Sequence, residues 1–201
     1  MECPTEITVE FGKKLTQHLD PTVDISIVKK DWCWKDFNEK FGYLRSDVEK
    51  FVENATDGEP TLFARHMVEY CGSDRKWAEQ FIKICKIGNP SYSAYRMIKD
   101  CGSDRKWAEE VIENDTIGNP LFNAYFMVEY CGSDRKWAER IIENATIGDP
   151  SYVAYLMVRD CGSDRKWAER IIEKPTIGNL LSVTRLMVKY CGSSQEWANS
   201  I

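Results

Sequence analysis

The chain has 201 residues, of which 43% are hydrophobic and 29% are charged, and its formal net charge is −5 at pH 7. No stretch approaches the ~20 apolar residues that a membrane helix needs, so we expect no membrane insertion. The negative charge disfavours a general nucleic-acid binder, because such proteins present a basic surface. No basic segment followed by an apolar one opens the chain, so we expect no secretory signal, an intracellular or cytoplasmic location, and reduced cysteines.

Residues 1–30 match no later segment, and we interpret them as an N-terminal cap with a helix from about Pro21. From residue 31 the sequence repeats with a period of 30 residues. Four copies of Cys-Gly-Ser-Asp-Arg-Lys-Trp-Ala-Glu begin at residues 71, 101, 131 and 161, and a degraded copy begins at residue 191. A fixed period of this length indicates stacked copies of one supersecondary unit. The predicted units are 31–60, 61–90, 91–120, 121–150, 151–180 and 181–201.

The unit 31–60 is a divergent copy. Its Gly42 aligns with Gly72 of the next unit. Trp34, Phe37 and Phe41 have the spacing of core residues on its first helix.

Residues 91–120 illustrate the unit. Asn89 can cap a helix, and Pro90 fits the first helical turn, because the N–H that proline lacks has no partner there. Apolar residues then follow from Ala94 at i, i+3, i+4 and i+7, which predicts a first helix over Pro90–Cys101. Gly102 is expected to end this helix in a left-handed conformation.

A second helix is predicted to begin after Ser103 or Asp104, either of which can cap it. Its apolar residues between Trp107 and Ile112 fall on one face. In the unit 151–180, Pro175 is expected to end this helix near Glu173.

A hairpin of two short helices cannot bury both apolar stripes alone, whereas a stack of hairpins can. Over residues 31–201 the pattern resembles the α-helical-hairpin solenoid repeat proteins as a class. It lacks the signatures of the roughly 34-residue tetratricopeptide and roughly 33-residue ankyrin repeats. The resemblance implies an all-α fold, an α-solenoid of 30-residue helical-hairpin repeats, and it carries over no functional residues.

The residues give little support for catalysis or metal binding. The two histidines, His18 and His66, belong to no recognisable catalytic or zinc arrangement. The cysteines at 71, 101, 131, 161 and 191 hold the same place in successive units. Stacked helices lie ~8–10 Å apart, which is too far for a disulfide between them. We therefore expect no enzyme, no cofactor and no metal site.

A tryptophan recurs at Trp77, Trp107, Trp137, Trp167 and Trp197. Because alanine and isoleucine flank it at helical spacing, we interpret it as a core residue. The alternative is an exposed aromatic strip that stacks bases or sugars.

The triplet Asp-Arg-Lys is identical in four units. Recent duplication is one explanation. A second is a structural ladder, in which an arginine pairs with a carboxylate of the next unit, such as Glu79 or Glu109. The last copy lacks the triplet, which fits a ladder that needs a following unit. A third is polyanion binding, which acidic neighbours would weaken. The residues concerned are Arg75, Lys76, Arg105, Lys106, Arg135, Lys136, Arg165 and Lys166.

Other positions of the first helix vary between units. The sixth position of the unit reads His66, Arg96, Phe126, Leu156 and Leu186, and the third reads Phe63, Ser93, Asn123, Val153 and Val183. The tenth alternates through Tyr70, Asp100, Tyr130, Asp160 and Tyr190. A constant frame with a varied strip is how repeat proteins present a binding surface. The alternative is drift at exposed positions, or covering by a neighbouring unit.

We therefore expect a non-enzymatic scaffold that binds a protein or peptide along the varied strip, through His66, Arg96, Phe126, Leu156, Tyr70, Asp100, Tyr130 and Asp160. The alternative is nucleic-acid or polyanion binding through the arginine and lysine row. Self-association is a further option at the ends of the stack.

Overall fold

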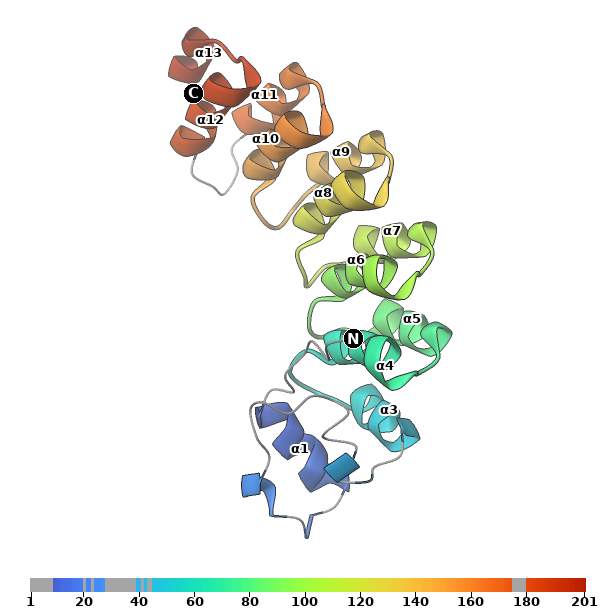
Figure 1. Cartoon of the computed structure of the whole chain (residues 1–201). Coiled ribbons are helices and arrows are strands. Elements are labelled where there is room, and N and C mark those ends of the chain that lie inside the picture. The colour runs from blue at the N-terminus through green and yellow to red at the C-terminus, as the bar shows by residue number, and fades with distance from the viewer. Residues whose placement is uncertain are drawn as a thin grey trace.

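The computed structural model describes residues 9–19, 21–22, 24–27, 39–40, 42, 45–174 and 180–201. These residues form an α-solenoid and contain no strand, which confirms the predicted fold class (Figure 1). The elements are α1 (Val9–Leu19), η1 (Ile25–Ile27), α3 (Arg45–Glu53), α4 (Pro60–Cys71), α5 (Arg75–Ile84), α6 (Pro90–Cys101), α7 (Arg105–Glu113), α8 (Pro120–Cys131), α9 (Arg135–Glu143), α10 (Pro150–Cys161), α11 (Arg165–Glu173), α12 (Leu180–Cys191) and α13 (Gln195–Ser200).

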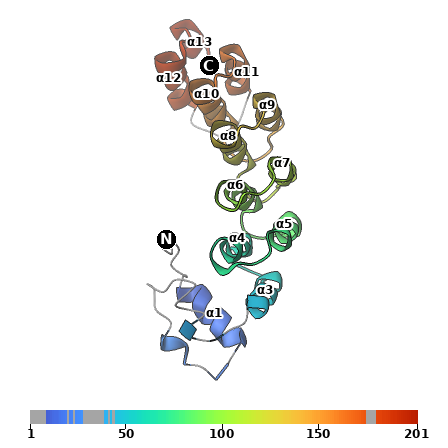
Figure 2. The ribbon, with the colours of Figure 1, turned by 45° about the vertical axis from the view of Figure 1, so that its right-hand side comes forward.

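The helices form two rows in a curved array (Figure 2). The inner row, on the concave side, consists of α4, α6, α8, α10 and α12, and each of these helices packs against the next one in the row. The outer row consists of α3, α5, α7, α9 and α11, and each of these helices contacts the inner helix of its own unit or the inner helix of the next unit. The helices of the inner row therefore form one continuous layer along the array.

The inner helices begin and end where the sequence predicts. Asn89 accepts a hydrogen bond from the N–H of Tyr92 at 3.1 Å, and Pro90 lies in the first turn of α6. Gly102 ends α6 with a left-handed φ of 68°, a conformation that other residues adopt at a cost. Its N–H donates hydrogen bonds to the carbonyl oxygens of Ile98 and Met97. These carbonyls at the helix end would otherwise lack a hydrogen-bond partner.

The outer helices are capped by the aspartate of the repeated triplet. Asp104 accepts from the N–H of Trp107 at 3.1 Å, so Asp104 and not Ser103 is the capping side chain. Helix α11 ends at Glu173 as predicted, but α7 and α9 end at the same place in their units without a proline. Pro175, which lies outside the described residues, is therefore not needed to explain this end.

The core lies between the two rows. Ala94 and Met97 of α6 and Ala108 and Ile112 of α7 are fully buried, and the same positions are fully or almost fully buried in neighbouring units. The apolar stripes of the two helices thus face each other and the next unit, as a stack of hairpins requires.

The N-terminal part differs from the prediction. The helix expected from about Pro21 is wrong for the described residues, because residues 21–22 form a turn and 25–27 a single 3-10 turn. A helix instead occupies residues 9–19, where Leu15 is fully buried and Lys14 pairs with Asp57 at 3.0 Å. The predicted core residues Trp34, Phe37 and Phe41 lie outside the described residues.

No helix in the described part of the chain is long and apolar enough to cross a membrane.

Candidate functional site

The arginine of the repeated triplet joins each unit to the next. Arg75 Nη1 donates to the carbonyl oxygen of Gly102 at 2.7 Å, and Arg105 makes the same bond to Gly132 at 2.5 Å. Arg45 of the divergent unit donates to Gly72 at 2.6 Å. Arg135 and Arg165 make the same bond to Gly162 and Gly192. An inter-unit ladder of arginines is therefore present, which is one of the three explanations considered for the repeated triplet.

The acceptor in this ladder corrects the prediction. We expected a carboxylate of the next unit, but Arg75 Nε pairs with Glu79 of its own helix at 3.5 Å, and Arg105 likewise with Glu109 at 3.7 Å. The inter-unit acceptor is a backbone carbonyl at the end of an inner helix. That carbonyl carries partial negative charge, which explains a cation there.

All four arginines named for the polyanion alternative therefore use a guanidinium nitrogen in a bond between units. Lys136 is also engaged, since its Nζ lies 2.7 Å from Glu139 Oε2. Lys76, Lys106 and Lys166 are exposed on the outer row.

The tryptophans form a second inter-unit ladder. Trp137 and Trp167 are buried, which confirms the core interpretation for them, while Trp77, Trp107 and Trp197 are half-buried. Each indole Nε1 except one donates to a glutamate at the end of the preceding outer helix. The bonds are Trp77 to Glu53 at 2.6 Å, Trp137 to Glu113 and Trp167 to Glu143 at 2.7 Å, and Trp197 to Glu173 at 2.9 Å.

Trp107 is the exception, because Lys83 stands where the other units have glutamate. Its Nε1 is buried and has no hydrogen-bond partner among the described residues. Lys83 instead pairs with Glu110 at 2.7 Å, which reverses the charges of the Glu113–Arg140 pair at the next junction.

The varied strip of the inner row is only partly accessible. At the sixth position His66 and Leu156 are buried, at 3% and 6% exposure, so they are not free to contact a partner as predicted. Arg96 and Phe126 are half-buried. The third position is buried from Ser93 onward, so these side chains are not available to a partner. Its members there are Ser93, Asn123, Val153 and Val183.

His66 belongs to a polar cluster between α4 and α6. Arg65 contacts the Nε2 of His66 and the carboxylate of Glu69, and it donates to Asp100 at 2.9 Å. Arg96 donates to the same Asp100 oxygen at 2.7 Å and to the Tyr92 hydroxyl at 3.0 Å. Burial, together with the positive charges of Arg65 and Arg96, lowers the pKa of His66 to about 3.

At the tenth position, both aspartates are held by side chains of the chain itself. Asp160 accepts from the hydroxyl of Tyr125 in the preceding unit at 2.9 Å and from Arg159 at 2.6 Å. Asp100 occupies the same place opposite Arg65. The hydrogen bond from Arg159 is the main cause that lowers the pKa of the Asp160 carboxyl. The carboxylates of both aspartates are therefore paired with arginine side chains of the same chain.

Tyrosine fills the alternate tenth positions: Tyr70 is half-buried against His66, with ring centroids 5.8 Å apart, whereas Tyr130 and Tyr190 are 57% and 54% exposed. Tyr130 lies against Phe126 with ring centroids 6.0 Å apart. Of the predicted strip, Phe126 and Tyr130 are therefore the apolar residues that the structure brings together at the surface.

Phe126 lies within a larger aromatic cluster that the sequence reasoning missed. Its ring centroid lies 5.4 Å from that of Tyr95, 5.3 Å from Tyr125 and 6.4 Å from Phe122. Phe122 in turn lies 6.0 Å from Tyr152 of the next unit. The aromatic cluster consists of Tyr92, Tyr95, Phe122, Tyr125, Phe126, Tyr130, Tyr152 and Tyr155. The sequence signal was an aromatic residue at the second and fifth positions of three consecutive units.

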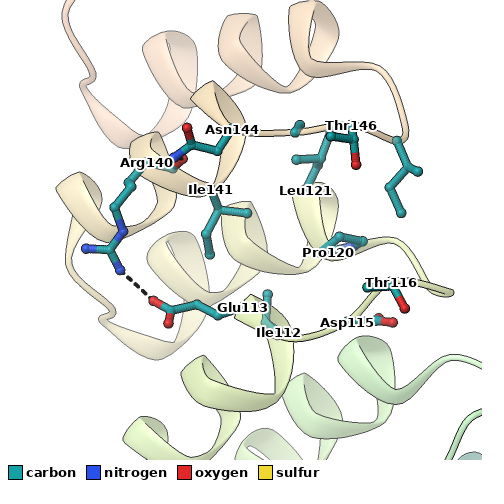
Figure 3. A pocket seen from close by; sticks show the side chains of 12 residues that line it. Ile112, Glu113, Asp115, Thr116, Pro120, Leu121, Arg140, Ile141, Asn144 and Thr146 are labelled. Atoms are coloured by element: carbon teal, nitrogen blue, oxygen red, sulfur yellow. Dashed lines mark hydrogen bonds and ion pairs between the residues drawn. The ribbon is translucent and has the colours of Figure 1, made fainter.

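Cavities recur at the same register between successive units. The cavity in Figure 3 has a volume of about 370 Å³, an apolar wall that includes Ile112, Leu121 and Ile141, and the Glu113–Arg140 pair at its edge, 2.6 Å apart. Equivalent cavities lie 30 and 60 residues earlier, where Lys83 and Glu53 stand in the place of Glu113. They follow from the stacking of successive units.

The described residues contain no group of three or more His, Cys, Asp or Glu side chains that would hold a metal ion. Burial raises the pKa of the Cys101 and Cys161 thiols to about 11. These thiols therefore stay protonated at neutral pH and are poor nucleophiles and ligands.

Comparison with protein-family models, with curated proteins and with solved structures finds no match to this chain.

Proposed function

We propose that the protein is a non-enzymatic scaffold that binds a protein or peptide on its inner row. The contact surface is the exposed part of the aromatic cluster, centred on Phe126 and Tyr130. The observation that supports this proposal is the position of the cluster: its rings belong to α6, α8 and α10, three neighbouring helices of the inner row, and this row lies on the concave side of the array (Figure 2). Aromatic residues are enriched at protein interfaces because they bury a large area with few rotatable bonds.

The different roles of the side chains in the two rows also support the proposal. On the outer row the repeated polar residues are used to join units, as the Arg75–Gly102 bond illustrates. On the inner row side chains vary from unit to unit, and Tyr130 and Tyr190 remain exposed. A rigid frame that carries a varied concave face suits recognition of one extended partner.

The test is affinity capture with the tagged chain from its native cell, followed by mass spectrometry. The inner-row variant is Phe126→Ala with Tyr130→Ala. The matched control is Lys106→Ala with Lys166→Ala, which changes two exposed residues of the outer row. Circular dichroism and thermal melting check that each variant keeps its fold.

Proteins retained by the wild type and the control but lost by the inner-row variant are the expected result. A partner set unchanged by the inner-row variant contradicts the proposal. Tyr130→Ala alone gives a second readout, because this side chain is mostly exposed and its loss has little effect on packing.

A further inference from the structure

Three cations recur at the ninth position of the unit, next to the aromatic cluster. Lys99, Arg159 and Lys189 are exposed, and each lies against a tyrosine ring. The distances to the ring centroids are 5.5 Å for Lys99 and Tyr130, 5.2 Å for Arg159 and Tyr155, and 4.8 Å for Lys189 and Tyr190. A row of cations with aromatic neighbours thus follows the inner row from α6 to α12.

The carboxylates of the same face are engaged within the chain. Asp100 is bound by Arg65 and Arg96, and Asp160 by Arg159 and Tyr125. Glu129, at the ninth position of the intervening unit, is half-buried, and its carboxylate interacts electrostatically with the hydroxyls of Tyr125 and Tyr130. Lys99 and Lys189 form none of the ion pairs found between described residues. The inner row therefore offers unpaired positive charge on a chain whose net charge is −5.

The spacing of the inner helices matches that of an extended peptide. Packed helices lie ~8–10 Å apart. A polyproline II segment advances ~9 Å in one turn of three residues. A peptide laid across the row then places every third residue over the next inner helix. Lys99 and Lys189 are three units apart, which corresponds to about nine residues of such a peptide.

We propose that the inner row binds an acidic peptide in an extended, polyproline II-like conformation, with apolar residues at every third position over the aromatic cluster and carboxylates near Lys99 and Lys189. This inference rests on the proposed function and specifies its ligand class. Lys99 and Lys189 favour carboxylates at the two ends of the peptide. The aromatic cluster favours apolar side chains in the centre of the peptide. Aromatic-lined surfaces suit this conformation, because little entropy is lost when the peptide binds.

Single-stranded nucleic acid also combines negative charge with groups that stack on rings. The inner row fits it less well. The cations at the ninth position are not continuous, because Glu129 stands between Lys99 and Arg159, whereas a nucleic acid presents a phosphate at every nucleotide. The rings of Phe126, Tyr95 and Tyr125 pack against one another, which leaves few faces free to stack on bases.

The test is fluorescence anisotropy with labelled probes of defined chemistry and the whole chain. The acidic probe is a peptide of about 12 residues with glutamates at both ends and a centre of prolines with leucine at every third position. The comparison probes replace the glutamates by glutamine or by lysine, or place leucine at every fourth position. A single-stranded oligoribonucleotide of similar length is the nucleic-acid probe.

We expect the acidic probe to bind about tenfold more tightly than the lysine probe, with a difference that shrinks as salt is raised. The charge-reversal variant Lys99→Glu with Lys189→Glu should abolish this preference. The matched control, Lys106→Glu with Lys166→Glu, alters net charge equally on the outer row and should retain it.

The outcomes separate the two proposals. Equal binding of the acidic, glutamine and lysine probes overturns the inference and leaves the proposed function standing. Failure of the acidic probe to bind at about millimolar concentration also overturns it, whatever the capture experiment finds. Tighter binding of the oligoribonucleotide than of every peptide overturns both proposals.

Discussion

Arg105, at the start of α7, donates a hydrogen bond of 2.5 Å to the carbonyl oxygen of Gly132, at the end of α8 in the next unit. The left-handed conformation of Gly132 turns the chain out of the helix at this carbonyl. The same bond recurs along the described array, from Arg45 to Arg165. An arginine that recurs in five successive units is thus a connector between units.

Replacement of Arg105 tests the connector. We expect Arg105→Ala to lower the free energy of unfolding by ~1 kcal/mol, because a charge-assisted bond to a helix end is lost while half of the side chain is already exposed. Lys106→Ala is the control and should change stability by less than about 0.5 kcal/mol. Urea unfolding followed by circular dichroism measures both. A stability of Arg105→Ala equal to that of the control would show that the bond contributes nothing.

Gly132 tests the acceptor side. A Cβ at this position would have Arg105 Nη1 as its nearest neighbour at 3.6 Å, so space is sufficient and only the φ of 70° is costly. We expect Gly132→Ala to destabilise by ~1 kcal/mol, and Gly132→Asn by less, because asparagine tolerates the left-handed region better. Thermal melting of the two variants gives their order. The reverse order would mean that crowding, not backbone conformation, selects glycine here.

The unpartnered indole of Trp107 predicts a stabilising pair of substitutions. Lys83→Glu supplies the acceptor that Trp137 has in Glu113, and Glu110→Arg restores the ion pair with its charges exchanged, as in Glu113–Arg140. We expect the double variant to gain ~1 kcal/mol, because a buried donor becomes satisfied. Lys83→Glu alone should gain less, since its carboxylate then faces Glu110.

Denaturant unfolding of the wild type, the single variant and the double variant measures this gain. Trp107→Phe in the double-variant background is the control, and it should remove the gain. No change in stability on making the double variant would contradict the equivalence of the two junctions.

Acidification should destabilise the fold through His66. The pKa of this side chain is about 3 in the folded chain, whereas an unperturbed histidine has a pKa of 6.5. At pH values between about 3 and 6.5, the unfolded state therefore binds a proton that the folded state does not. Stability is therefore fully present above about pH 6.5 and falls by roughly 1.4 kcal/mol per pH unit below it.

The comparison with His66→Gln isolates the histidine. Unfolding of both chains at several pH values between about 4 and 7 should show a steeper loss of stability for the wild type. Parallel curves for the two chains would mean that His66 takes up its proton in the folded state.

The elements of the repeat could be predicted because their causes are local. Asn89, Pro90 and Gly102 fix the ends of α6 through their own backbone chemistry, and the apolar spacing fixes its buried face. The helix α1 was missed for the same reason, because Gly12 in its interior is a poor helix former and no repeat supports it. Its stability comes from packing, as the burial of Leu15 illustrates.

Contacts between units were harder to predict. Arg75 and its equivalents donate to a backbone carbonyl 27 residues further along the chain. Every residue has such a carbonyl, so no side chain in the sequence marks the acceptor. The Trp137–Glu113 bond did leave one, since glutamate occupies that place before each tryptophan except Trp107. The burial of Ser93 and His66 depends on how closely the units pack. The 30-residue period of the sequence does not predict this distance.

The central claim is that the inner row binds and the outer row connects. Hydroxyl-radical footprinting of the chain, alone and with a partner recovered by capture, tests this claim most directly. We expect slower oxidation of Tyr130 and Tyr190 on the inner row when the partner is bound, and unchanged oxidation of Ile84, which is 70% exposed on α5. Protection of Ile84 with Tyr130 and Tyr190 still fully reactive would contradict it.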